Sequence, residues 1–217
     1  MAPAPSEEIR LITASAKFPT RGPGRVARAL GTAYLWLFGW KVEGVRPPVP
    51  CAVLIAAPHT SNWDLPFMLA MAYVLGLRPS WLGKAELFRW PFGWLMRRLG
   101  GLPVDRGARQ NLVEQAVGEF AKRDELILVV PPSGTRSRAP HWKSGFYHIA
   151  RLAGVPIVCT YLDYGRKRGG IGPVFKPSGD VRADMHRIRA FYADVTGKYP
   201  ALTTPVRLRE EDDESAA

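Results

Sequence analysis

His59 and Asp64 are the two residues whose types and spacing could carry out acid–base chemistry. On one continuous helix they would point about 140° apart, but they can meet if His59 precedes the helix. Ser61 is a good N-cap, and with Asp64 three residues later it forms a capping-box-like start. We therefore expect Asp64 to fix the tautomer of His59, while His59 takes a proton from a substrate hydroxyl.

The same spacing also has a purely structural interpretation. Asp64 could be only a capping acid, and His59 could be a loop residue whose ring bonds to the backbone. Spacing alone leaves both interpretations open.

Two later segments place cations where a phosphate could bind. Residues 101–106 end in Arg106, and residues 131–137 contain Gly134 and Arg136. Arginine binds phosphate in a planar, bidentate manner, and glycine lets the backbone approach a ligand closely. Both segments suit a phosphorylated headgroup, although each arginine taken alone is typical of a solvated surface.

These residues need elements that bring them together. The predicted strands are 52–58, 80–83, 102–105, 125–131 and 155–163, and the predicted helices are 25–40, 62–75, 86–98, 108–122, 143–153 and 181–196. Short apolar strands separated by helices indicate an α/β fold, a mostly parallel sheet covered by helices. Ligand sites in such sheets lie beyond the carboxyl ends of the strands, where His59, Arg106 and Arg136 fall.

Length and composition favour one domain with two tails. A chain of 217 residues that is 47% hydrophobic excludes collagen, wholly disordered proteins and multipass membrane proteins. We expect a flexible N-terminal tail over 1–20, one domain over 21–202 and an acidic disordered tail over 203–217. The first twenty residues lack a signal-peptide pattern, so the cytoplasmic side is expected. Cys51 and Cys159 lie in apolar runs and indicate neither a disulfide framework nor a metal site.

The chain is strongly basic, with a net charge of +11, and without the five acids at 210–214 the formal charge would be +16. Such a body attracts a polyanion: nucleic acid, an anionic bilayer or a phosphorylated substrate. The segment Trp81–Arg98 mixes aromatic, aliphatic and basic residues, which favours a membrane interface over stacking on single-stranded bases or ordinary core packing. The apolar helix 25–40 is too short to span a bilayer and either lies in the interface or packs as a core helix.

Four segments in this order resemble the motif blocks of the glycerolipid acyltransferase family, which includes lysophosphatidic acid acyltransferases. They are His59-x-x-x-x-Asp64, Gly101–Arg106, Pro132–Ser137 and Val155–Val158. The resemblance covers about residues 25–195. It implies that His59 and Asp64 form the catalytic dyad and that substrate phosphate is held by Arg106, Ser133, Gly134, Thr135, Arg136 and Lys143. It further implies that Val155–Val158 line the acyl side.

The chain departs from the family pattern at two positions. Ser133 stands where the third block usually has Glu, and Cys159 stands where the fourth block usually continues into Pro. Ser133, His59 and Asp64 together contain the residue types of a serine hydrolase. The strained Gly-x-Ser-x-Gly turn is missing, however, because Pro131 and Thr135 occupy its glycine positions.

We therefore expect an O-acyltransferase of phospholipid biosynthesis at the cytoplasmic face of the membrane, peripheral or monotopic. It would move a fatty acyl group from acyl-CoA or acyl carrier protein to the hydroxyl of a lysophosphatidate-like acceptor. His59 would act as general base, backbone N–H groups including that of Gly134 would stabilise the oxyanion, and no metal or cofactor is implied. The alternative is a non-catalytic, basic lipid- or RNA-binding protein, although no specific nucleic acid is expected.

Overall fold

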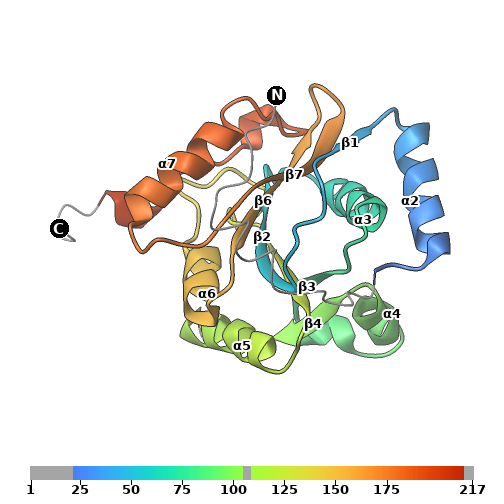
Figure 1. Cartoon of the computed structure of the whole chain (residues 1–217), viewed down its shortest axis with the longest axis horizontal. Helices are drawn as coiled ribbons and strands as arrows, with labels where there is room; N and C mark the ends of the chain where they lie inside the picture. The colour runs from blue at the N-terminus through green and yellow to red at the C-terminus, as the bar shows by residue number, and fades with distance from the viewer. Residues whose placement is uncertain (1–21, 105–108, 213–217) are drawn as a thin grey trace.

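The computed structural model describes residues 22–104 and 109–212. Figure 1 shows a central sheet with helices on both sides. In chain order the elements are α2 (Arg25–Leu37), β1 (Lys41–Glu43), β2 (Cys51–Ala57), α3 (Asp64–Val74), β3 (Pro79–Lys84), η1 (Ala85–Phe88), α4 (Gly93–Arg98), β4 (Gly101–Val104), α5 (Arg109–Ala121), β5 (Leu126–Val130), α6 (Gly145–Ala153), β6 (Ile157–Asp163), β7 (Arg168–Phe175), α7 (Val181–Tyr192), η2 (Pro200–Leu202) and η3 (Arg209–Glu211).

The seven strands form one sheet in the order β1-β7-β6-β2-β5-β3-β4. All neighbouring pairs are parallel except β6 and β7, which form an antiparallel pair. The prediction of a mostly parallel sheet covered by helices is confirmed. The carboxyl ends of β2, β5 and β6 lie side by side, because Ile55 is in register with both Val130 and Cys159.

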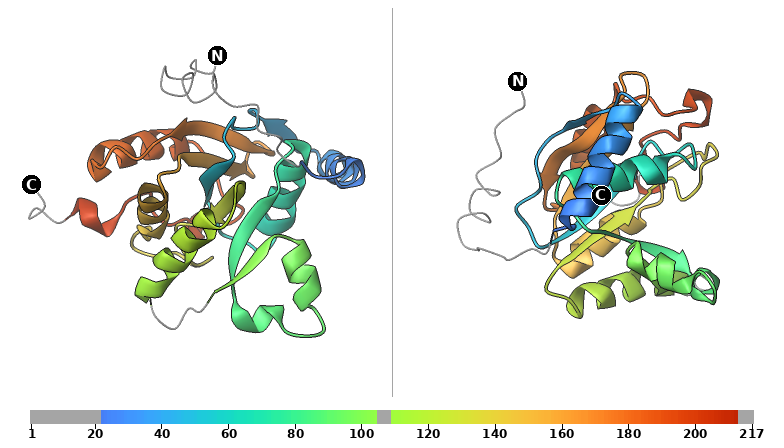
Figure 2. Two further views of the ribbon diagram at one scale, coloured as in Figure 1. Left: turned by 60° about the horizontal axis from the view of Figure 1, so that its bottom comes forward. Right: turned by 90° about the vertical axis from the view of Figure 1, so that its right-hand side faces the viewer.

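Alternation along the central strands builds a core on each face of the sheet. In β2, Val53 and Ile55 face the larger core with α6 and α7, whereas Ala52 and Leu54 face the core beneath α3. This alternation follows from the two-residue period of a strand. Helix α2 lies outside α3 as a further layer, as the two views of Figure 2 show.

Strands β1 and β7 are absent from the sequence prediction. Strand β7 contains Gly169, Gly170 and Gly172, and glycine has a weak intrinsic preference for strands. The structure needs small residues here, because a Cβ on Gly170 would lie 1.9 Å from the carbonyl oxygen of Glu43 on β1. Packing between strands has therefore overridden local preference.

Two predicted helices end differently in the structure. The helix expected over 25–40 ends at Leu37, because Gly39 adopts a φ of +70° and Trp40 turns back into the core. The helix expected over 86–98 is divided into η1 and α4, with Pro91 between them, a residue that cannot donate a backbone hydrogen bond. In the described ranges no helix has the length and apolar character needed to cross a bilayer.

The expected disordered tail over 203–217 is wrong for residues 203–212. Leu208 is fully buried in the larger core, and its backbone forms a bridge with Trp142. Acidic residues of this segment also form ion pairs, Glu211 with Arg189 and Asp212 with Arg207. Arg207 belongs to the segment itself, so of these two pairs it is the one between Glu211 and Arg189 of α7 that attaches the segment to the domain. Residues 213–217 and the expected N-terminal tail lie outside the described residues.

Burial of Leu208 leads to a first prediction. Leu208→Ala should lower the free energy of unfolding by about 2–5 kcal/mol, because it removes a buried side chain and leaves a cavity. Leu202→Ala, at a more exposed position just before the segment, should change it by only about 0.5 kcal/mol. Urea unfolding of both variants measures the difference. Equal losses would show that the C-terminal segment does not pack against the domain.

Candidate active site

The segment between β2 and α3 holds the first two candidate residues. Strand β2 ends at Ala57 and α3 begins at Asp64, so His59 lies in the connecting loop. The carboxylate of Asp64 accepts hydrogen bonds from the backbone N–H groups of Thr60 (2.9 Å) and Ser61 (3.0 Å). The Ser61 hydroxyl accepts one from Trp63 N. These bonds shape the loop ahead of α3, but the helix begins at Asp64, two residues later than expected, and its N-cap is Trp63 rather than the expected Ser61.

His59 and Asp64 are in direct contact. Nδ1 of His59 lies 3.0 Å from Oδ2 of Asp64. An ionised carboxylate can only accept, so Nδ1 carries the proton and Nε2 of the neutral ring is left as a proton acceptor. Within the described residues Nε2 has no hydrogen-bond partner, and the ring lines a large cavity. This arrangement is capable of general-base chemistry.

Tyr164 is a further residue of this cluster that sequence reasoning missed. Its hydroxyl donates to Oδ1 of Asp64 at 2.8 Å, from the turn that follows β6. Its ring packs edge-on against Trp40, at 4.9 Å between ring centroids. The only available signal was its position directly after a predicted strand, and the sequence does not show that this strand pairs with β2.

The hydrogen bonds to Asp64 determine its charge. Burial alone would raise the pKa of this carboxyl, which is only 5% exposed, but hydrogen bonds from His59, Ser61 and Tyr164 outweigh burial and lower the pKa below its ordinary value. Burial and the neighbouring carboxylate together raise the pKa of Tyr164 well above its ordinary value. At neutral pH Asp64 is therefore charged and Tyr164 is a hydrogen-bond donor.

The loop after β5 is a tight turn. Gly134 has a φ of +64°, and its N–H donates to the carbonyl oxygen of Pro131 at 3.0 Å. The Ser133 hydroxyl donates to the carbonyl oxygen of Thr135 at 2.7 Å. The Gly134 N–H is thus already bonded, so the expectation that it stabilises an oxyanion is wrong for this geometry.

The turn brings Lys143 to the same loop. The backbone N–H of Lys143 donates to the carbonyl oxygen of Pro132, and the amino group would lie 2.9 Å from a Cβ on Gly134. Glycine at 134 therefore makes room for the lysine side chain. Arg136 is exposed at the end of the turn, and the described residues offer it no acidic partner. Two cations from separate segments consequently flank one loop.

Of the expected site residues, Arg106 lies outside the described residues, and one group of the others is not brought to this site. Residues 155–158, expected on the acyl side, are buried at the start of β6 and do not line the cavity. They occupy the amino end of a strand, whereas the cavity borders its carboxyl end at Thr160, Tyr161 and Leu162. No group of metal-ligating side chains occurs within the described ranges.

A cavity of about 1170 Å³ joins these groups. Its polar lining includes His59, Asp64, Lys143 and all residues of the turn from Ser133 to Arg136. Its apolar lining extends beneath α3 as far as Leu77, which precedes the amino end of β3. The two ends of a seven-residue strand such as β2 lie roughly 23 Å apart, at about 3.3 Å per residue. Because the cavity borders residues near both ends of the strands, it reaches deep beneath the helix.

Comparisons with known proteins agree with this picture. The family model described as Acyltransferase matches residues 42–163, more than half of the chain. A 1-acyl-sn-glycerol-3-phosphate acyltransferase of Haemophilus influenzae is 34% identical over 146 residues, covering 62% of this chain and 58% of the relative. The protein of the same name from Escherichia coli is 33% identical over 132 residues, covering 56% and 52%. The chain thus spans a little over half the length of these relatives.

A solved structure has the same fold. The crystal structure of the 1-acyl-sn-glycerophosphate (LPA) acyltransferase of Thermotoga maritima matches with a TM-score of 0.53 and 18% identity, covering 84% of each chain. The match supports the α/β architecture. Tyr164 and the C-terminal segment lie outside the range matched by the family model.

The hydrogen bond from Tyr164 leads to a prediction about acid stability. The folded-state pKa of Asp64 is lowered, so its charge stabilises the protein above the unfolded-state pKa, and this stabilisation is lost as the pH falls through the folded-state pKa. Tyr164→Phe removes one bond to that charge. The free energy of unfolding at neutral pH should fall by about 1.5–3 kcal/mol, and acid unfolding should begin at a higher pH.

Urea unfolding across a pH series measures both effects. Tyr199→Phe is the matched control, because no hydrogen bond to the Tyr199 hydroxyl is found among the described residues. An acid transition in Tyr164→Phe at the same pH as in the wild type would show that Tyr164 does not support the charge of Asp64.

Proposed function

The chain belongs to the acyltransferase family, and on this premise we propose that it transfers a fatty acyl group from a thioester to the hydroxyl of a lysophosphatidate-like lysolipid. The observation that carries the proposal is the hydrogen bond between His59 and Asp64 at the wall of a deep, largely apolar cavity. A base beside an apolar cavity suits a reaction in which a lipid hydroxyl attacks an acyl carbonyl.

The chemistry needs one base and no covalent enzyme intermediate. His59 Nε2 takes the proton of the acceptor hydroxyl while the hydroxyl oxygen forms a bond to the carbonyl carbon of the thioester. The resulting oxyanion collapses, the carbon–sulfur bond breaks, and the departing thiolate takes the proton from His59. Asp64 stabilises the imidazolium that exists between these two transfers.

The cations beside the turn suit the acceptor's phosphate. In our proposal Arg136 forms the charge-assisted bonds, and Lys143 adds a point charge beside Gly134. Ser133 and Thr135 shape the turn through their own hydrogen bond. Arg106 joins this group only through the family resemblance.

The apolar part of the cavity suits the acyl chain of the donor. Met68, Met71 and Leu77 border it beneath α3, and unbranched methionine adapts to a flexible ligand. We propose acyl-CoA or acyl carrier protein as the donor, because both present the acyl group as a thioester.

A serine hydrolase mechanism fits the geometry less well. The Ser133 hydroxyl donates to Thr135, and no hydrogen bond within the described chain joins it to His59. A nucleophilic serine needs its base as the acceptor of its proton.

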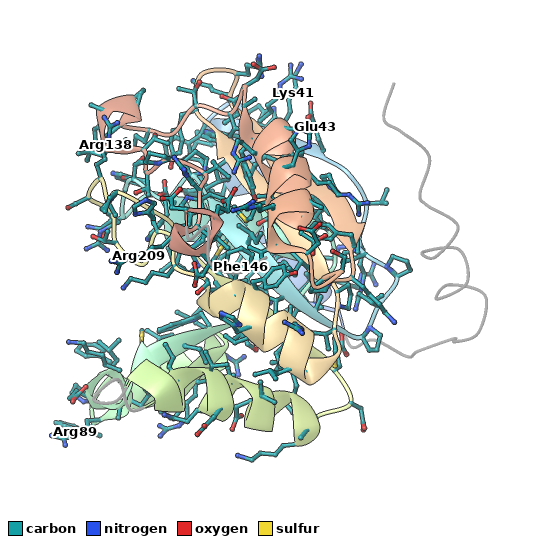
Figure 3. The ribbon with its side chains drawn as sticks, turned by 90° about the vertical axis from the view of Figure 1, so that its left-hand side faces the viewer. Lys41, Glu43, Arg89, Arg138, Phe146 and Arg209 are labelled. Atoms are coloured by element: carbon teal, nitrogen blue, oxygen red, sulfur yellow. The ribbon has the colours of Figure 1, made fainter. Side chains whose placement is uncertain are left out.

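The exposed aromatic residues support attachment to a membrane surface. Trp90 is 92% exposed, and Leu87 of η1, Trp94 of α4 and Phe92 between these two elements are also exposed, whereas Phe88 is buried. We call these four exposed residues the aromatic patch. Figure 3 shows Arg89 of this segment at the lower end and Arg138 at the upper end of one edge of the molecule. We propose peripheral or monotopic attachment at the cytoplasmic face, with this edge toward the lipid.

Helix α2 offers a second apolar surface on the same side of the molecule. Its buried face, including Gly31 and Leu35, packs on α3, while Val26, Leu30 and Leu37 are exposed. Figures 1 and 2 show α2 and α4 on the same side. The helix therefore fits both of the roles expected for residues 25–40. One face packs against the protein like a core helix, and the other is exposed and could meet lipid.

His59→Ala tests the proposed base. Turnover of labelled acyl-CoA with lysophosphatidate should fall at least about 10²-fold, the scale of general-base catalysis, while circular dichroism stays unchanged. His148→Ala is the control, because His148 also lines the cavity and no carboxylate of the described chain bonds to it. Near-normal turnover in His59→Ala would remove the dyad from the mechanism. A wild-type protein that binds lysolipid without transfer would indicate the non-catalytic alternative.

The aromatic patch is tested by flotation on anionic liposomes. Trp90→Ala combined with Trp94→Ala should reduce the bound fraction, and added salt should weaken the remaining attraction. Leu152→Ala, at an apolar residue on α6 that is as exposed as Trp94, should leave binding unchanged. Equal binding to neutral and anionic vesicles, or tighter binding to single-stranded RNA than to either, would contradict the proposal.

A further inference from the structure

The C-terminal segment, residues 203–212, is attached directly behind the phosphate-binding turn. The backbone N–H of Trp142 donates to the carbonyl oxygen of Arg207 at 2.8 Å, and that of Ala139 donates to the Thr204 hydroxyl at 3.0 Å. Residues 139–142 join the turn to Lys143. The segment therefore fixes the stretch of chain between two of the cations that we place in the site.

Ion pairs at the end of the segment determine which of its charges are left for a ligand. Glu211 pairs with Arg189, and Asp212 pairs with Arg207 and, at 3.2 Å, with His141 Nε2. Arg209 is different, because no acid in the described part of the chain pairs with it and its side chain lines the cavity. Figure 3 shows Arg209 at the same edge as Arg138.

Arg209 thus joins Arg136 and Lys143 as a third cation at one cavity. The three come from three separate segments: the turn after β5, the start of α6 and the C-terminal segment. A phosphate monoester carries roughly −1.5 to −2 charges at neutral pH, so one cation does not balance it. Guanidinium groups bind such oxygens in a bidentate manner.

Glu210, the residue after Arg209, is an acid that also lines the cavity. In a helix of about three residues per turn, consecutive side chains point about 120° apart, so Glu210 and Arg209 project in different directions from η3. The charge of Glu210 opposes an anion. Removing the negative charge of Glu210 should therefore strengthen phosphate binding, whereas removing the positive charge of Arg209 should weaken it.

We propose that Arg209 is a phosphate-binding residue and that the C-terminal segment completes the substrate site. The proposal rests on the proposed function for the source of the phosphate, which is either the acceptor's headgroup or the nucleotide of coenzyme A. The phosphate monoester is the chemistry common to both.

The test uses soluble fragments of the two substrates, so binding is measured without catalysis. Glycerol 3-phosphate represents the acceptor and adenosine 3′,5′-bisphosphate represents the nucleotide of the donor. The thermal unfolding midpoint of the full chain is recorded against the concentration of each, for the wild type, Arg209→Gln, Glu210→Gln and Arg207→Gln. Arg207→Gln is the matched control, because it removes the same charge two residues away, outside the cavity lining.

We expect Arg209→Gln to weaken binding of one fragment about tenfold, while Arg207→Gln binds like the wild type and Glu210→Gln binds at least as tightly. Loss confined to glycerol 3-phosphate identifies the acceptor, and loss confined to the bisphosphate identifies the donor. Equal binding by Arg209→Gln and Arg207→Gln, or no binding of either fragment by the wild type, overturns the proposal.

A transfer assay separates this inference from the proposed function. If the wild type transfers no acyl group but Arg209→Gln weakens phosphate binding, the proposed reaction fails and the phosphate site stands. If the wild type is active and the KM values for both substrates are equal in Arg209→Gln and Arg207→Gln, the reaction stands and the role of Arg209 fails.

Discussion

The buried charge of Asp64 is the interaction on which the rest of the site depends. A carboxylate taken out of water is stable only when hydrogen bonds and an adjacent donor replace its solvent. Here Thr60 and Ser61 donate from the loop, His59 donates from its ring, and Tyr164 donates from the turn after β6. This set of donors keeps the loop out of the helix and requires β6 to lie beside β2.

The parallel sheet supplies the second part of the geometry. The chain leaves β2 through α3 on one face and leaves β5 through α6 on the other, so the connections after these adjacent strands diverge. A crevice forms at such a point beyond the carboxyl ends. His59 follows β2 and the Ser133–Arg136 turn follows β5, so a base and a cation face one cavity although they are more than seventy residues apart.

The sequence was sufficient to predict what local patterns determine. Apolar strands between helices predicted the mostly parallel sheet, and the spacing of Ser61 and Asp64 predicted that His59 would lie outside the helix. It was insufficient where long-range packing decides. The glycines of β7 hide a strand whose neighbours need small residues, and Tyr164 meets Asp64 only because of the strand order. The acids at the C-terminus resemble a solvated tail until their partners, Arg189 and Arg207, are known.

The distribution of polarity in the cavity matches the way a lysolipid lies in a bilayer. Aromatic residues settle at the level of the lipid headgroups, where amphipathic rings have both apolar and polar surroundings. Arg89, in the segment that carries the aromatic patch, lies at the lower end of the edge that presents Arg138 and Arg209 higher up in Figure 3. If the patch enters the interface, these cations come to the depth of the phosphates, and each basic residue near an anionic surface adds about 1 kcal/mol of attraction.

An acceptor could then place its headgroup between Arg136 and Lys143 and present its hydroxyl to His59 without leaving the bilayer entirely. The apolar space beneath α3 would meanwhile shelter the acyl chain of the proposed donor from water. In our proposal, one excess of positive charge thus serves both attachment to the membrane and selection of the substrate.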